Sequence, residues 1–237
     1  MNKILITGTG RCGTTFLMKL FILLNYDTGW TSNNYFNAIS NNCNSGLERN
    51  YTDNHYILKN PTFLLDIEQI ILDDSINIEY IIIPIRNYDT SAKSRVFHKN
   101  KNGGLWNATD LESQLSMYHT IISNYIYIAT KYEINTIFID FDKMITDSKY
   151  LYNKLNNILN IKNITFNEFN KIYNTATKTS SPTEIFNAKQ NKPSAQEKPT
   201  KNNKPDKQDK QNKPDKQNKP DKNNKPGKQN KSANPSK

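Results

Sequence analysis

Residues 8–15 read Gly8-Thr9-Gly10-Arg11-Cys12-Gly13-Thr14-Thr15, directly after a short apolar run at residues 3–7. Residues 14–24 then carry apolar side chains at helical spacing. A strand, a glycine-rich turn and a helix in this order are typical of a phosphate loop, because small residues let backbone N–H groups and a helix N-terminus converge on an anion. The pattern therefore favours phosphate binding over an ordinary strand-to-helix turn.

The cations of this loop are not where phosphoryl-transfer enzymes carry them. Loops that hydrolyse ATP or GTP have a Lys after the last glycine, where it reaches the β- and γ-phosphates. Thr14 stands at that position, and a cation appears inside the loop instead, at Arg11, two residues before Gly13. This departure disfavours a small-molecule or nucleotide kinase.

Strand-like and helix-like segments alternate along the rest of the chain. Strands are expected at residues 56–59, 78–85 and 135–140, and helices at residues 62–73, from residue 89, from the end of a loop at 101–109 to about 132, at 150–159 and at 166–173. Residues 25–54 are polar and are expected to be irregular. The alternation predicts an α/β fold of the P-loop NTPase-like kind, a parallel sheet with helices on both faces and ligands at the carboxyl ends of the strands.

The composition changes sharply near residue 180. Residues 181–237 hold 15 lysines, six acidic residues and eight of the ten prolines, so this segment carries +9 of the net charge of +10. Its near-repeats of Asn, Lys, Pro, Asp and Gln offer almost no apolar surface to offset the entropy of ordering. We therefore expect a domain at residues 1–180 and a disordered tail at 181–237, which is solvated or contacts polyanions weakly.

The cysteines and the N-terminus indicate the compartment. Cys12 and Cys43 are too few for a disulfide framework and have no metal-ligand spacing, so a reducing environment is expected. The longest apolar stretch, residues 16–24, is too short to span a bilayer and is interrupted by Lys19. The sequence thus predicts a cytoplasmic protein without a membrane partner.

Two motifs resemble those of the sulfotransferase family. Arg11-Cys12-Gly13-Thr14-Thr15 is similar to its 5′-phosphosulfate loop, with Cys12 where Ser is usual. That family binds the 3′-phosphate of its donor with an Arg at a strand end and a Ser eight residues later, a spacing that Arg86 and Ser94 match, although Tyr88 replaces the customary Pro. The resemblance implies 3′-phosphoadenosine 5′-phosphosulfate as donor and no required metal.

A third resemblance concerns the catalytic groups. Leu58-Lys59-Asn60-Pro61 looks like the Lys-x-Pro strand end of the wider superfamily, but the His that soluble members place after this Lys is missing. Some branches use a Glu from the segment after the first helix, and Glu48 is the candidate base here, with His55 as its rival. The likeness covers about residues 1–160, including a late strand and acidic turn at 138–143.

The expected site residues follow from these motifs. Donor binding is assigned to Gly8, Gly10, Arg11, Cys12, Gly13, Thr14, Thr15, Arg86 and Ser94, and catalysis to Lys59, Glu48 and Arg11.

Each assignment has a structural alternative. Arg86 could pair with Asp89 at a helix start, and Lys59 could be an ordinary solvated lysine. Trp106 could line an acceptor pocket or anchor its own loop. His98 and His119 are expected on solvated helix faces.

The leading hypothesis is therefore transfer of a sulfuryl group to a hydroxyl or amine of an unknown sugar, peptide or metabolite. Such a transfer needs in-line placement, cations on the departing phosphate oxygen and a base on the acceptor. The alternatives are a P-loop kinase and a non-catalytic nucleotide-binding protein.

Overall fold

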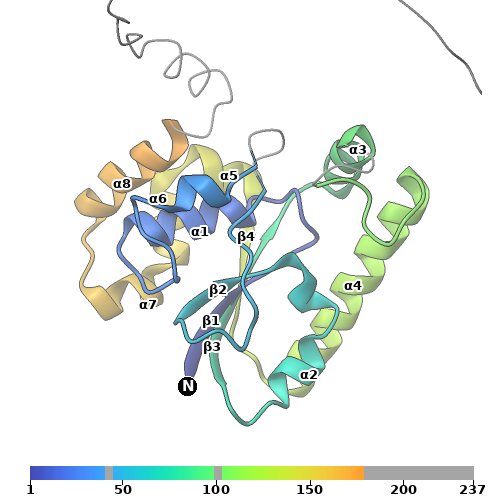
Figure 1. The fold of residues 1–237 in the computed structure, drawn as a ribbon, viewed down its shortest axis with the longest axis horizontal. Coiled ribbons are helices and arrows are strands. Elements are labelled where there is room, and N and C mark those ends of the chain that lie inside the picture. Colours follow the sequence, from blue (N-terminus) through green and yellow to red (C-terminus); the bar gives the residue numbers. More distant parts are fainter. Residues whose placement is uncertain (41–44, 99–102, 179–237) are drawn as a thin grey trace, which may run out of the picture. The chain divides into compact units, whose positions relative to one another are not determined.

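The computed structural model describes residues 1–40, 45–98 and 103–178. Every described residue belongs to one unit of the chain, Met1–Lys192. Its centre is a four-stranded, all-parallel sheet in the order β2-β1-β3-β4 (Figure 1). The strands are β1 (Asn2–Ile6), β2 (Ile57–Lys59), β3 (Asn77–Ile85) and β4 (Thr136–Asp140). The predicted α/β class and parallel sheet are confirmed.

Both faces of the sheet are covered, because successive strand residues point to opposite sides. Ile4, Ile6 and Ile82 belong to one hydrophobic core, and Leu5 and Ile81 to a second one. The near-continuous apolar sequence of β1 and β3 follows from this double burial.

The helices divide between the two faces. The first core includes buried residues of α1 and α5 to α8, and the second core includes residues of α2 and α4 (Figure 1). The bounds are α1 (Thr14–Leu23), α2 (Ile67–Ile71), α3 (Tyr88–His98), α4 (Leu111–Lys131), α5 (Phe141–Thr146), α6 (Ser148–Lys154), α7 (Asn156–Leu159) and α8 (Phe166–Lys178), with short 3₁₀ helices at Tyr35–Ala38, Pro61–Leu64 and Asn160–Lys162.

The expected single helix at residues 62–73 is wrong. The segment forms the 3₁₀ helix Pro61–Leu64 and then α2, with Leu65 and Asp66 between them. Thr7 donates a hydrogen bond to the carbonyl of Pro61, and the N–H of Leu65 bonds the carbonyl of Thr62 three residues back. The first turn therefore closes as a 3₁₀ turn before α2 begins after Asp66.

The region after β4 also differs from the sequence-based expectation. The acidic turn after the strand is the start of α5, because the carboxylate of Asp140 accepts from the N–H of Lys143 and caps that helix. The expected helix at 150–159 is divided into α6 and α7 at Leu155. The predicted domain boundary at 180 lies outside the described residues. Within them, no helix has both the length and the apolar character needed to cross a membrane.

Candidate functional site

The segment between β1 and α1, residues 7–13, is called the glycine loop below. β1 lies between β2 and β3, and its last residue, Ile6, is in register with Lys59 and Ile82. The glycine loop therefore lies at the carboxyl end of the sheet, where parallel α/β sheets bind ligands. Gly13 is the N-cap of α1 in a left-handed conformation (φ 93°), and no side chain caps the helix there.

The conformation of the loop explains two of its glycines. Gly10 has φ 74°, and a Cβ at this position would lie 2.0 Å from Nη2 of Arg95. A Cβ on Gly13 would lie 2.5 Å from the terminal methyl of Met144 and 3.0 Å from the ring of Phe141. Both glycines are required by positive φ and by close neighbours, so the pattern predicted from the sequence has a steric cause.

Arg11 occupies a left-handed conformation (φ 57°) that favours glycine. A non-glycine residue in this region costs on the order of 1 kcal/mol. The half-buried guanidinium donates through Nε to Oγ of Ser94, 3.2 Å away. The strained backbone is thus combined with a side chain that faces α3.

Cys12 does not face outward with Arg11. Its side chain is fully buried, and a Cβ at position 8, where the chain has glycine, would lie only 2.7 Å from Sγ of Cys12. Burial raises the pKa of the Cys12 thiol, and bonds from the N–H of Gly10 and the hydroxyl of Thr9 partly offset the shift. The thiol therefore fills the inside of the loop as a small buried group.

The structure brings the second predicted motif to the same place. Nη1 of Arg86 donates to the carbonyl oxygen of Arg11 at 3.1 Å, and its guanidinium stacks 4.6 Å from the centroid of the Phe141 ring. The alternative pairing with Asp89 is not seen, since Asp89 pairs with Lys93 at 2.6 Å. Arg86 therefore contacts the backbone of the glycine loop directly.

Arg95 is a site residue that the sequence reasoning missed. Its side chain is buried, and it donates through Nη2 to the carbonyl of Thr9 at 3.1 Å. Arg95 lies three residues after Ala92 on the buried face of α3, and the sequence alone did not indicate which face of this helix is buried. A buried guanidinium needs polar partners, and the loop backbone supplies one here.

Lys59 and Glu48 form an ion pair on the other side of the loop. Nζ of Lys59 donates to Oε1 of Glu48 at 2.5 Å and to the carbonyl of Gly46 at 2.9 Å. The Lys59 side chain is 1% exposed, whereas that of Glu48 is 43% exposed. Burial lowers the pKa of Lys59, and the charge of Glu48 opposes this shift. The lysine is therefore not an ordinary solvated one, and its carboxylate partner is open to a ligand.

The remaining candidates lie apart from the loop or act structurally. His55 contacts Asp27 through Nδ1 at 2.8 Å, and its carbonyl accepts from Lys3 at the other end of the sheet. His119 is exposed on α4, as predicted, and His98 is half-buried at the end of α3.

Trp106 anchors its own segment. Its backbone N–H donates to Oε1 of Gln114 at 2.8 Å, and Gln114 is fully buried in α4. The ring centroid of Trp106 lies 5.2 Å from the guanidinium carbon of Arg95. These contacts favour the anchoring interpretation over an acceptor pocket.

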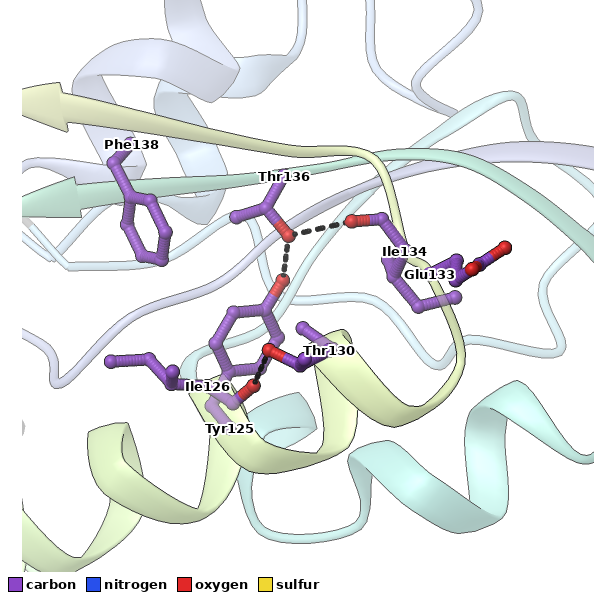
Figure 2. A pocket seen from close by; sticks show the side chains of 8 residues that line it. Tyr125, Ile126, Thr130, Glu133, Ile134, Thr136 and Phe138 are labelled. Atoms are coloured by element: carbon purple, nitrogen blue, oxygen red, sulfur yellow. Dashed lines mark hydrogen bonds between the residues drawn. The ribbon is translucent and has the colours of Figure 1, made fainter.

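A hollow of about 320 Å³ lies elsewhere, between the end of α4 and the start of β4 (Figure 2). It is lined by Tyr125, Ile126, Ala129, Thr130, Glu133, Ile134, Thr136 and Phe138. The phenol of Tyr125 hydrogen-bonds the hydroxyl of Thr136 at 2.5 Å, and no residue of the glycine loop lines the hollow. The hollow is therefore separate from the candidate phosphate site.

Comparison with models of protein families, with curated proteins and with solved structures gave no match for this chain.

Proposed function

We propose that the chain transfers a sulfuryl group from 3′-phosphoadenosine 5′-phosphosulfate to a hydroxyl or amine. The observation that carries the proposal is the hydrogen bond between Arg11 and Ser94, which joins two motifs 83 residues apart in the sequence. A donor with a 5′-phosphosulfate and a 3′-phosphate requires both motifs in one cluster. Arg86, on the carbonyl of Arg11, belongs to that cluster.

The cations near the loop support a sulfuryl rather than a phosphoryl donor. The position of the usual lysine is taken by Thr14, which is 5% exposed. Arg11 and Arg86 instead carry their charge to the loop, where α1 begins without an acidic residue in its first turn. Charged groups held in place before reaction stabilise a departing phosphate oxygen without a metal-bound triphosphate.

The ion pair of Lys59 and Glu48 supplies the acid–base chemistry. Glu48 accepts the proton of the acceptor hydroxyl as the acceptor oxygen bonds to sulfur. The bond between sulfur and the bridging phosphate oxygen breaks, and adenosine 3′,5′-bisphosphate leaves with that oxygen. The ammonium of Lys59 stabilises the negative charge on it. Glu48 replaces the missing histidine in this scheme.

A binding screen tests the proposal. Adenosine 3′,5′-bisphosphate is expected to raise the unfolding temperature without magnesium, since saturation to about 100 times the dissociation constant adds about 2.7 kcal/mol to stability. A larger and magnesium-dependent shift with ATP or GTP would instead support a kinase. A second assay tests turnover, by adding the phosphosulfate donor together with pooled acceptors. The non-catalytic alternative would be supported if the chain binds adenosine 3′,5′-bisphosphate but releases none from the donor.

A further inference from the structure

Arg95 contacts two segments that lie far apart in the sequence. Nη2 donates to the carbonyl of Thr9 in the glycine loop at 3.1 Å, and Nη1 donates to the carbonyl of Gly104 at 2.5 Å. The Trp106 ring lies beside the same guanidinium. One planar group therefore connects the glycine loop with residues 104–106, called the Trp106 segment below.

The fit on the loop side leaves no spare room. A Cβ at position 10 would lie 2.0 Å from Nη2 of Arg95, which real structures do not allow. On the other side, Gln114 of α4 holds the backbone of Trp106. The Trp106 segment is thus attached to α4 by Gln114 and to the loop by Arg95.

The charge of Arg95 is compensated differently from that of its neighbour Lys93. The exposed Lys93 pairs with the carboxylate of Asp89, whereas the 7% exposed Arg95 is held by carbonyl oxygens. A buried cation held only by dipoles is costly, and a nearby anion lowers that cost. The phenol of Tyr118 also lies beside Arg95, and burial raises the pKa of Tyr118 and keeps that neighbour neutral.

We infer that Arg95 is a positioning residue that couples phosphate binding in the glycine loop to the Trp106 segment. An anion in the loop stabilises the buried guanidinium, and the buried guanidinium holds Gly104 and Trp106 in place. By linkage, a held Trp106 segment strengthens anion binding by the same factor. The inference rests on the proposed binding of donor phosphates, and it adds a residue that no sequence motif assigned.

Trp106 fluorescence reports this coupling. The chain has two tryptophans, so a Trp30→Phe background leaves Trp106 as the sole tryptophan, which is excited selectively at wavelengths that tyrosine does not absorb. Adenosine 3′,5′-bisphosphate, added without magnesium, is expected to reduce quenching of Trp106 by the neutral quencher acrylamide. Arg95→Met should weaken the bisphosphate about 10-fold and abolish the ligand-dependent change.

Two further variants separate charge from geometry. Arg95→Lys keeps the charge but cannot hold both carbonyls in one fork, so affinity should fall only about 3-fold while the ligand-dependent change in quenching is lost. The matched control Lys93→Met, on the same helix, should change neither the affinity for the bisphosphate nor the ligand-dependent change in quenching. An undiminished ligand-dependent change in Arg95→Lys and Arg95→Met would overturn the inference.

A ligand-free double-mutant cycle keeps this test independent of the proposed function. Gly10→Ala displaces the guanidinium, so it should increase acrylamide quenching of Trp106 when Arg95 is present and add little in an Arg95→Met background. Equal effects in the two backgrounds would contradict the coupling, even if the bisphosphate binds. If the cycle shows coupling but wild type binds no adenosine phosphate, the proposed function fails and the coupling stands.

Discussion

Cations lie on both sides of the glycine loop, and they are held in different ways. On the β2 side, Lys59 is neutralised by the carboxylate of Glu48. On the β3 side, Arg86 donates to the carbonyl of Arg11 and Arg95 donates to the carbonyl of Thr9. A cation paired with a carboxylate attracts a second anion weakly, whereas one held by neutral oxygens keeps most of its field. The β3 side is therefore suited to phosphate binding, and the β2 side to proton transfer.

The largest effect is expected from the β2 side. Lys59→Met should lower release of adenosine 3′,5′-bisphosphate from the donor about 10²- to 10³-fold, since it removes the charge that stabilises the departing oxygen. The affinity for the bisphosphate should change by less than about 3-fold, because Glu48 loses its partner but the β3 cations remain. The rate of bisphosphate release and the affinity by titration calorimetry are both measured on the folded variant. An equally large loss of affinity would show that Lys59 also binds the phosphates, so that binding and catalysis are not separated between the two sides.

The next effect tests the strained residue of the β3 side. Arg11→Gly should weaken the bisphosphate about 10- to 100-fold, through loss of a charged contact. It should also stabilise the ligand-free fold by about 0.5–1 kcal/mol, because glycine adopts positive φ without strain. Arg11→Ala is the control, since it loses the charge but keeps the strain. Equal stability of the two variants in urea denaturation would refute the strain argument.

The sequence predicted more of the sheet than of the site. Strands such as β3 are buried on both faces and show it as apolar runs, and the glycines of the loop are required by local φ. The contacts of Arg95 with Thr9 and Gly104 depend on how α3 packs, which local patterns do not encode. The same holds for the bond from Thr7 to Pro61, which joins the glycine loop to the first turn before α2.

The candidate site residues divide in the same way. Arg11, Arg86 and Ser94 were found because their spacing matches a motif, and the structure places them together. Glu48 was named as the candidate base from a long irregular segment, and its ion pair with Lys59 was not indicated by the sequence. His55 shows the limit of proximity in sequence, since β2 separates it from the loop although it precedes Lys59 by only four residues.

A third prediction compares these cations with one far from the loop. Lys19 in α1 donates to the carbonyl of Ala176 in α8 at 2.7 Å, and burial lowers the pKa of Lys19 to about 8. The unfolded chain keeps this proton up to about pH 10.5, so the folded state gains stability as the pH rises from about 8 to 10.5.

The size of this gain is about 1–2 kcal/mol once solvent screening is allowed for. In urea titrations, the free energy of unfolding of wild type minus that of Lys19→Met should be larger at pH 10 than at pH 7.5. A difference that does not grow with pH would show that Lys19 is charged in the fold throughout this range.

The smallest effect is expected from removing residues 181–237. The segment carries most of the net charge but almost no apolar side chains, so unfolding and bisphosphate affinity of the truncated chain should match those of the full chain. Calorimetry on both chains provides the comparison. Loss of cooperative unfolding would mean that the fold of residues 1–178 needs the segment.

We propose that the β3 side of the glycine loop recognises a second phosphate. The most direct measurement is the affinity of wild type and Arg86→Ala for adenosine 3′,5′-bisphosphate and adenosine 5′-monophosphate, by calorimetry without magnesium. The bisphosphate should weaken about 10- to 150-fold, and the monophosphate only about 3-fold, through the lost bond to the carbonyl of Arg11. Equal weakening of the two ligands in a folded Arg86→Ala variant would contradict the claim.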